Sequence, residues 1–318
     1  MGLKTTRARE RNELFSPMSC IKIEIASPMY HRFVLGASLP TMLKNAAPYT
    51  SRGWSLVWTP TLERQPSRIS SFFETHRANL RGAVEDLERT FRTCIPEALA
   101  IKPSVMSAWD TFRLVHMSRD RLRELWMDAE DSDRYRRDLR HTYALFKRVY
   151  ERYPQVHTYT TIQSVRKDCF DVLEMHLRRS REDGIPIGIK LVRGAYARRP
   201  ETHWMRKQET DHAFHTCLDR IWSEPTTERP IRLVLATHNR CNIRSVLDRI
   251  RSDGHPKDLT ISIAQLRGLN TDDWIDEARE CDVIPKLLAP FGTVWDSIPY
   301  LIRRVRENPS MLKYLWVR

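Results

Sequence analysis

Short apolar runs alternate with longer amphipathic stretches from about residue 54 onward, and this alternation constrains the fold more than any other feature. The runs are rich in Ile, Leu and Val without strict alternation of apolar and polar residues, which is typical of strands buried on both faces. The predicted strands are Trp54–Trp58, Leu99–Met106, Leu125–Met127, Val156–Thr161, Ile185–Val192, Ile231–Ala236, Leu259–Leu266 and Lys286–Ala289.

Between these runs, apolar residues recur at spacings of three and four, which predicts amphipathic helices. Such stripes lie in Asn79–Thr93, Arg134–Arg152 and Asn242–Arg251. A further helix is expected near the C-terminus, where Asp296 or Ser297 can cap it and Pro299 fits its first turn.

Strands that alternate with helices, without an antiparallel hairpin signal, predict a parallel sheet. Eight strands in roughly 240 residues suit an α/β fold of the TIM-like (β/α)8 barrel type. A doubly wound open sheet is the alternative, but neither of its usual glycine-rich phosphate motifs occurs. We expect the barrel to occupy residues 51–318. Residues 1–50 are expected to form an irregular or helical arm, broken by Pro17, Pro28, Pro40 and Pro48.

The chain is strongly basic, with 53 Lys and Arg against 40 Asp and Glu and a net charge of +13. Such a charge fits a solvated surface, an anionic membrane, an anionic cofactor or nucleic acid. Arginines stand beside acids along the chain, as in Asp131–Arg140 and Arg179–Asp183, which disfavours a nucleic-acid interface. No stretch approaches the ~18 apolar residues of a spanning helix, so a soluble or peripheral protein is expected.

Six scattered cysteines, none in a C-x-x-C pair, indicate free thiols in a reducing compartment. Zinc sites need clustered ligands, and the sequence has no such cluster. We therefore predict no metal site.

Barrel enzymes place their chemistry at the C-terminal ends of the strands. Polar residues follow five of the predicted strands at this position. They are Lys102, Asp128, Lys190, Arg193, Thr237, His238, Asn239 and Gln265. A single charge beside a strand is usually solvated, but all eight residues are expected at the same rim of the barrel, and this favours a shared site.

The predicted last helix carries Arg303, Arg304 and Glu307. Adjacent helical residues diverge by ~100°, so the two arginines cannot bind one anion as a single fork. Glu307 can pair with either of them, so that one is braced while the other faces a carboxylate or pyrophosphate. The alternative is an ordinary solvated helix face.

These residues stand in blocks that resemble the proline dehydrogenase (proline oxidase) family, its fungal members most, over roughly residues 54–312. The blocks are Ile101-Lys102, Met127–Glu130, Lys190–Tyr196, Lys207 with Thr210-Asp211, Ala236–Asn239, Gln265-Leu266 with Gly268, and Tyr300–Arg304 with Glu307-Asn308.

The resemblance implies a distorted (β/α)8 barrel with FAD at its mouth and the last helix over the site. It implies oxidation of L-proline to Δ1-pyrroline-5-carboxylate, with electrons passed to a membrane quinone on the matrix side of the mitochondrial inner membrane. The N-terminus does not support that location independently, because transit peptides avoid acids such as Glu10 and Glu13.

The resemblance also implies residue roles. Arg303 and Arg304 would hold the substrate carboxylate with Glu307 bracing them, Lys102 would add positive charge there, and Leu266 and Tyr300 would form an apolar wall. The implied flavin-binding residues are Asp128, Lys190, Arg193, Tyr196, Lys207, Thr237, His238, Asn239 and Gln265.

Two departures from the family pattern put the activity in question. Thr160 is expected to stand where the family has a flavin-binding glutamine, and Leu288 where it has a tyrosine in the substrate pocket. A missing polar group can relax specificity. The alternatives are therefore a dehydrogenase for hydroxyproline or another cyclic amino acid, and a non-catalytic family member.

Overall fold

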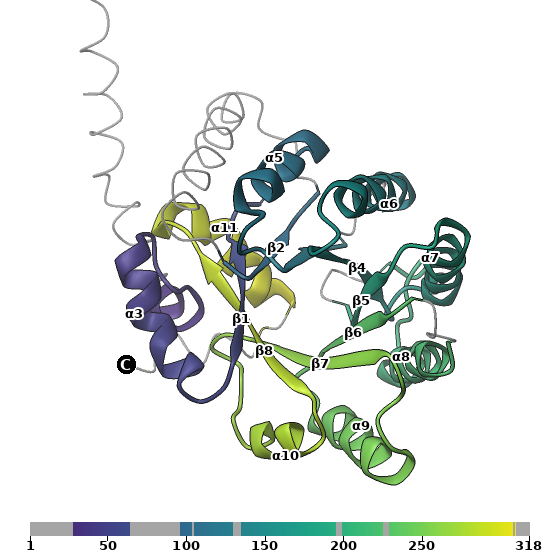
Figure 1. The fold of residues 1–318 in the computed structure, drawn as a ribbon. Helices are drawn as coiled ribbons and strands as arrows, with labels where there is room; N and C mark the ends of the chain where they lie inside the picture. The colour runs from purple at the N-terminus through teal and green to yellow at the C-terminus, as the bar shows by residue number, and fades with distance from the viewer. Residues whose placement is uncertain are drawn as a thin grey trace, which may run out of the picture.

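The computed structural model describes residues 28–63, 96–103, 105–129, 135–194, 199–224, 229–307 and 309. Eight parallel strands form a closed barrel in which each strand pairs with its neighbours in chain order (Figure 1). The strands are β1 (Ser55–Pro60), β2 (Ala98–Ile101), β3 (Glu124–Met127), β4 (His157–Gln163), β5 (Ile187–Val192), β6 (Ile231–Ala236), β7 (Leu259–Leu266) and β8 (Ile284–Phe291).

The predicted TIM-like α/β barrel is confirmed, and the open-sheet alternative is wrong because β1 pairs with β8. That pairing runs in register from Ser55 opposite Lys286 to Pro60 opposite Phe291. Six of the predicted strands differ from the observed ones at one or both ends. The largest differences are in β2, which ends at Ile101, two residues before Pro103, and in β8, which extends to Phe291.

Helices surround the strands (Figure 1). They are α5 (Ala108–Ser118), α6 (Tyr135–Arg152), α7 (Cys169–Asp183), α8 (Lys207–Trp222), α9 (Arg240–Asp253) and α10 (Ile275–Glu280). Helices α6 and α9 match two of the predicted amphipathic stripes, and they bury Phe146 and Leu247 against the barrel. The third predicted stripe, 79–93, lies outside the described residues.

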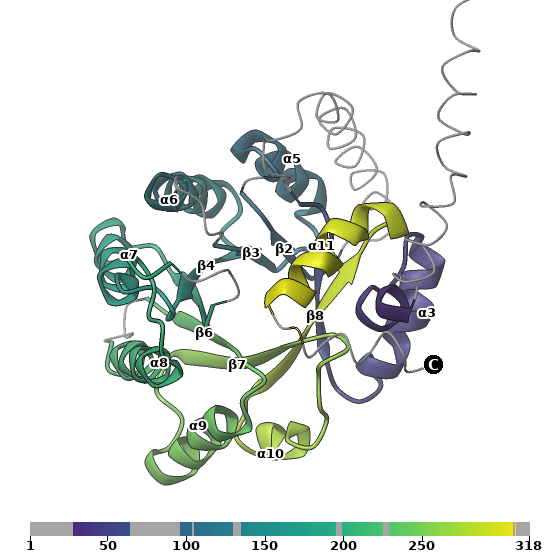
Figure 2. The same ribbon diagram turned by 180° about the vertical axis from the view of Figure 1, so that it is seen from behind.

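The last helix, α11 (Val294–Glu307), crosses the end of the barrel instead of joining the outer ring (Figure 2). It begins three or four residues earlier than predicted, because the Thr293 hydroxyl accepts the Asp296 N–H at 3.2 Å. Neither Asp296 nor Ser297 is therefore the cap. Pro299 is the sixth residue of the helix and lies beyond its first turn.

The segment that precedes β1 is helical over 28–33 and again in α3 (Leu39–Thr50). The expectation that Pro40 and Pro48 break this segment is wrong. Pro40 lies in the first turn of α3, where its missing N–H costs nothing, and Pro48 lies in the last turn. Met42 and Ala46 of α3 join the main core. A division of the chain at residue 50 stays a prediction.

A buried ion pair crosses the interior of the barrel. The Lys286 ammonium on β8 donates to Glu124 on β3 at 2.7 Å, and the indole of Trp126 donates to the same carboxylate at 3.0 Å. Tyr159 packs beside Trp126, and its ring occupies the space that a side chain at Gly188 would need. This layer fills the barrel below its carboxyl-terminal end.

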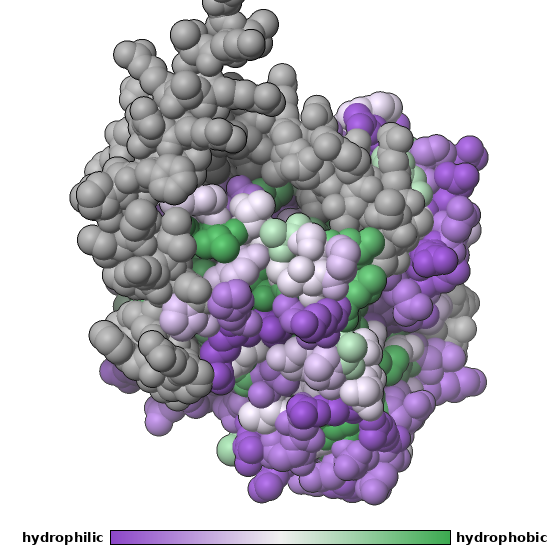
Figure 3. All heavy atoms as spheres, turned by 90° about the vertical axis from the view of Figure 1, so that its left-hand side faces the viewer, coloured by the Kyte–Doolittle hydropathy of each residue, from purple (hydrophilic) through white to green (hydrophobic). Residues whose placement is uncertain are grey.

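Hydrophilic side chains cover most of the lower part of the face shown in Figure 3. Exposed ion pairs, such as that of Arg251 with Glu277, also occur on the surface of the protein. Among the residues that the structure describes, no helix combines the length and the apolar composition that crossing a lipid bilayer requires.

The buried pair predicts a large effect of removing one charge. Glu124→Gln leaves the Lys286 ammonium buried without its counter-charge, so the free energy of unfolding should fall by about 3–5 kcal/mol. Adding Lys286→Met should recover part of the loss, because neither charge then remains. Chemical denaturation measures both changes.

The control is Asp248→Asn, which removes an exposed partner of Arg251 and should change the unfolding free energy by less than about 0.5 kcal/mol. If Glu124→Gln and the control lowered the free energy of unfolding equally, the buried pair would contribute no more to stability than an exposed pair.

Candidate functional site

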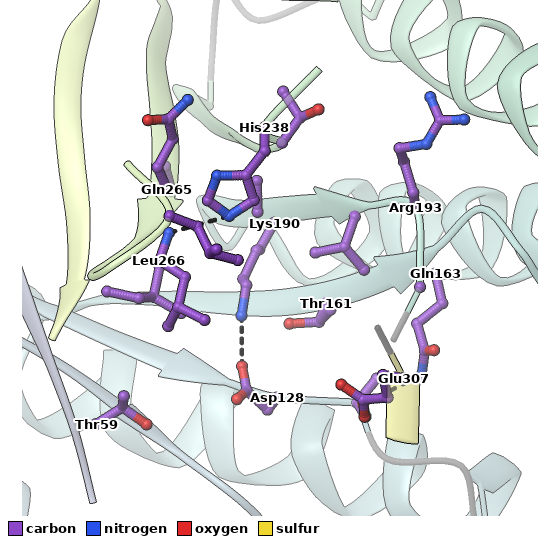
Figure 4. Close-up of a pocket in the computed structure, with 18 of the residues that line it drawn as sticks. Thr59, Asp128, Thr161, Gln163, Lys190, Arg193, His238, Gln265, Leu266 and Glu307 are labelled. Atoms are coloured by element: carbon purple, nitrogen blue, oxygen red, sulfur yellow. Dashed lines mark hydrogen bonds and ion pairs between the residues drawn. The ribbon is translucent and has the colours of Figure 1, made fainter. Parts of the chain in front are cut away.

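A cavity of about 480 Å³ opens at the carboxyl-terminal end of the barrel, beneath α11. Each of the eight strands, or the loop that follows it, contributes to the lining (Figure 4). The lining residues are Thr59, Lys102, Asp128, Ala129, Thr161, Gln163, Lys190, Val192, Arg193, Gly194, Ala236, Thr237, His238, Asn239, Ala264, Gln265, Leu266, Leu269, Leu288, Tyr300, Arg304 and Glu307.

Most of the residues predicted for the site lie in this one cavity. They are Lys102, Asp128, Lys190, Arg193, Thr237, His238, Asn239, Gln265, Leu266, Tyr300, Arg304 and Glu307. Arg303 and Lys207 are not part of the lining, and Tyr196 lies outside the described residues. Lys207 is 71% exposed and pairs with Asp211, which also binds Arg193, so Lys207 reaches the site only through this carboxylate.

Asp128 and Lys190 meet across the floor of the cavity, from the ends of β3 and β5. The Lys190 ammonium donates to the Asp128 carboxylate at 2.5 Å (Figure 4). Burial raises the pKa of Asp128, but the charge and hydrogen bond of Lys190, together with the charges of Lys102 and Arg304, outweigh burial and hold that pKa below its ordinary value. The carboxylate therefore stays ionised and fixes the position of the Lys190 side chain.

Lys102 is 6% exposed, and Glu63 holds it at the edge of the cavity. Its ammonium donates to the Leu62 carbonyl at 2.8 Å and to the Glu63 carboxylate at 3.1 Å. Burial lowers the pKa of Lys102, and Glu63 opposes this shift. The ammonium lies 5.5 Å from the centre of the Tyr300 ring, so its charge stands beside an apolar wall.

The adjacent arginines of α11 diverge as predicted. Arg303 turns to Glu63, and its Nε lies 2.9 and 2.8 Å from the two carboxylate oxygens. Arg304 lines the cavity. Glu307 braces both, at 2.8 Å from Arg303 and 3.0 Å from Arg304. Burial raises the pKa of Glu307 despite these two cations. Only one of the two guanidiniums therefore faces the ligand space.

His238 is neutral, because burial lowers its pKa to about 4. Its Nε2 accepts the Leu266 N–H at 3.3 Å, so the ring proton resides on Nδ1. The neighbouring Asn239 caps α9, since its side-chain oxygen accepts the Cys241 N–H at 2.9 Å. The Thr237–Asn239 turn thus fixes the start of α9 and leaves His238 with one N–H donor.

The expectation that Thr160 replaces the family's glutamine is wrong. The Thr160 hydroxyl lies 3.3 Å from Nε2 of His176 on α7, on the outer side of the barrel. Thr161 and Gln163 line the cavity instead. Gln163 is the last residue of β4, and its amide donates to the Ala129 carbonyl at 3.1 Å. Counting strand positions by side-chain alternation from the end of β4 would have found it.

Glu63 and Thr59 are the other residues that sequence reasoning missed. Both belong to or follow β1, whose predicted end at Trp58 was too early to include them. Leu288 lines the cavity, as the substitution of a pocket tyrosine implies. Four cations and two carboxylates therefore share the lining, and this excess of positive charge suits an anionic ligand.

Comparisons with known proteins agree with this geometry. A family model for proline dehydrogenase matches residues 56–315. Human proline dehydrogenase 1, mitochondrial, is 30% identical over 166 residues, which is 49% of this chain and 28% of that protein. Human hydroxyproline dehydrogenase is also 30% identical over 166 residues, 36% of its length. Proline dehydrogenase 2, mitochondrial, of Arabidopsis thaliana is 32% identical over 165 residues, 34% of its length.

Two solved structures share the fold. Proline utilization A from Bdellovibrio bacteriovorus aligns with a TM-score of 0.63 and 18% identity, over 98% of this chain and 36% of that one. The protein of the same name from Corynebacterium freiburgense has the same TM-score over 94% of this chain. The matched regions cover about a third of each of these longer relatives. On the family match over 56–315, this chain belongs to the proline dehydrogenase family.

Proposed function

We propose that the chain is an FAD-dependent oxidoreductase that converts L-proline to Δ1-pyrroline-5-carboxylate. The observation that carries this proposal is the single cavity that unites Lys102, Lys190, His238 and Arg304 from four distant stretches of the chain. A volume of about 480 Å³ lies within the range of cofactor and small-molecule sites.

The residues of the cavity fit a flavin. An isoalloxazine ring presents an N–H donor and carbonyl acceptors along one edge. Gln163 offers an acceptor, because its buried Oε1 has no hydrogen-bond partner within the described part of the chain. Lys190, held in place by Asp128, would supply the positive charge that stabilises electron density on a reduced ring.

Arg193, Thr237, Asn239 and Gln265 would contact the remainder of the cofactor, as the family resemblance implies. Asp211 pairs with Arg193 and orients it, and Lys207 binds that same carboxylate. When bound, FAD supplies a two-electron acceptor for the hydride that leaves the substrate carbon beside nitrogen.

The substrate carboxylate would bind Arg304, whose planar guanidinium matches a carboxylate through two parallel hydrogen bonds. Tyr300, Leu266 and Leu288 would enclose the ring of the amino acid. Hydride leaves only when the nitrogen lone pair is free. Lys102 and Arg304 favour that state, because nearby cations disfavour a second positive charge on the substrate amine. Arg303 would support Arg304 indirectly, through the Glu307 carboxylate that both arginines share.

A membrane quinone would accept the electrons, on the matrix side of the mitochondrial inner membrane. Two of the relatives above are named mitochondrial, and a net charge of +13 favours docking on an anionic lipid surface.

Hydroxyproline is a second candidate substrate. Leu288 lines the cavity where the family pattern has a tyrosine, and a smaller side chain leaves room for a ring hydroxyl. A hydroxyproline dehydrogenase matches this chain at the same 30% identity as the human proline enzyme.

The test of the function is spectroscopic. The purified full chain, supplied with FAD, should retain a yellow flavin that L-proline bleaches in the absence of oxygen. Bleaching by hydroxyproline alone would identify the second candidate. A protein that binds no flavin, or that neither amino acid bleaches, would contradict an enzymatic role and favour a non-catalytic family member.

Removing the cation that faces the ligand should weaken substrate binding. Arg304→Met removes both hydrogen bonds to the carboxylate, worth about 3 kcal/mol, so KM for proline should rise about 100-fold. The matched control is Arg306→Met, because Arg306 is exposed on the same helix. If steady-state kinetics showed an equal rise in KM for both variants, the assignment of Arg304 to the substrate carboxylate would be wrong.

Leu288 should determine how the cavity distinguishes the two substrates. Leu288→Tyr fills the space beside the substrate ring, so the ratio of kcat/KM for hydroxyproline over proline should fall about tenfold. Leu288→Met keeps an apolar side chain of similar volume and should leave the ratio unchanged. An unchanged ratio in the tyrosine variant would remove Leu288 as the cause of any altered specificity.

A further inference from the structure

Residues 28–36 form a strap that is attached to the junction between β8 and α11. The Leu35 N–H donates to the Pro290 carbonyl at 2.7 Å, and the Gly292 N–H donates to the Gly36 carbonyl at 3.0 Å. The hydroxyl of Tyr30 also donates to the Gly292 carbonyl, at 2.8 Å. These three hydrogen bonds therefore attach the strap to the residues that connect β8 to α11.

The strap also packs against α11 itself. A separate apolar cluster joins four strap residues to two residues of the helix. Its members are Met29, Tyr30, Phe33, Val34, Tyr300 and Leu301. Leu266, the last residue of β7, and Leu269, in the loop that follows, pack against the same cluster. Tyr300 thus faces the cavity while it rests on the strap, which lies beside α11 in Figure 2.

Arg267, in the loop after β7, binds the strap. It is 7% exposed, and one nitrogen, Nη1, donates to three strap carbonyls: His31 at 3.0 Å, Arg32 at 2.7 Å and Val34 at 2.9 Å. These carbonyls lie at or just after the end of the helical turn 28–33, where no further turn supplies backbone N–H donors. Burial lowers the pKa of Arg267, yet a guanidinium remains charged, so the three acceptors compensate its desolvation.

The strap also donates a hydrogen bond to the loop that carries Arg267. Nε of Arg32 donates to the Gly268 carbonyl at 2.9 Å. Gly268 has a φ of +90°, and a Cβ there would lie 2.7 Å from the Phe33 ring. The close approach therefore requires glycine beside Arg267.

Arg267 also touches the cavity wall through its backbone. Its N–H donates to the Leu288 carbonyl at 2.9 Å, and its neighbour Leu266 lines the cavity. We propose that Arg267 is a positioning residue, which fixes the strap so that α11 holds Tyr300 and Arg304 over the substrate. This inference rests on the proposed function.

The physical reason is that α11 crosses the barrel mouth and does not stand in the outer ring of helices (Figure 2). Its cavity-facing groups must be placed within fractions of an ångström to bind a small carboxylate. Without Arg267, the strap carbonyls lose their shared donor, and the helix loses the support behind Tyr300 and Leu301. Ground-state contacts of Arg304 and Tyr300 then weaken, which raises KM more than it lowers kcat.

The test compares three full-length variants. Arg267→Met keeps the stem and removes the donors. Arg267→Lys restores one nitrogen with three donors, which suits three acceptors that converge on one atom. Arg251→Met is the control, because it removes the same charge from an exposed site on α9.

We expect Arg267→Met to raise KM for proline about tenfold with a smaller change in kcat, and Arg267→Lys to recover most of the affinity. Hydrogen exchange gives a readout that needs no activity. Amides of α11 should exchange about tenfold faster in Arg267→Met, while those of α9 stay unchanged.

The kinetics and the exchange together separate the two proposals. Faster exchange confined to α11, in a protein that does not oxidise proline, would support the role of Arg267 and contradict the proposed function. Unchanged exchange in α11, or equally faster exchange in α9 and α11, would overturn the positioning role. Failure of lysine to recover affinity would overturn it as well.

Discussion

The parallel pairing of β1 with β8 is the constraint on which the site depends. Most side chains of the cavity lie at or just after the end of a strand, and the strand ends become neighbours across the mouth only when the sheet closes. Asp128 and Lys190 come from strands separated by β4, yet their charged groups lie 2.5 Å apart. An open sheet would leave these groups in a row. Closure of the barrel brings charged residues that are 60 or more positions apart in the sequence into one electrostatic environment.

Three carboxylates organise the cations of that environment. Glu63 binds Lys102 and Arg303, Asp128 binds Lys190, and Glu307 braces Arg303 and Arg304. Each ion pair lowers the cost of burying a positive charge and fixes the direction of a flexible side chain. The excess of cations over acids remains available to a ligand. The geometry therefore favours a substrate carboxylate beside a group that becomes electron-rich, which is the demand of flavin-dependent amino acid oxidation.

The residues outside the barrel control how that environment is covered. Helix α11 supplies the only helical residues in the described lining, and its position depends on the strap and on Arg267. The segment before β1 thus contributes to the site although none of its side chains in the described range 28–54 lines the cavity. A distant segment of the chain thus supports the helix that covers the cavity, whereas the strand ends supply the rest of the lining.

The sequence alone determined the strand order, the barrel class and most of the lining, because buried strands have a distinct apolar pattern and polar residues directly follow them. It also predicted the divergence of Arg303 and Arg304, which follows from helical geometry. Tertiary structure decided the rest. Which face of β4 points inward, and hence Gln163 in place of Thr160, depends on strand register. Glu63 holds Arg303 away from the cavity, and the strap packs against α11. Both arrangements depend on contacts between residues more than 230 positions apart in the sequence, which no local pattern encodes.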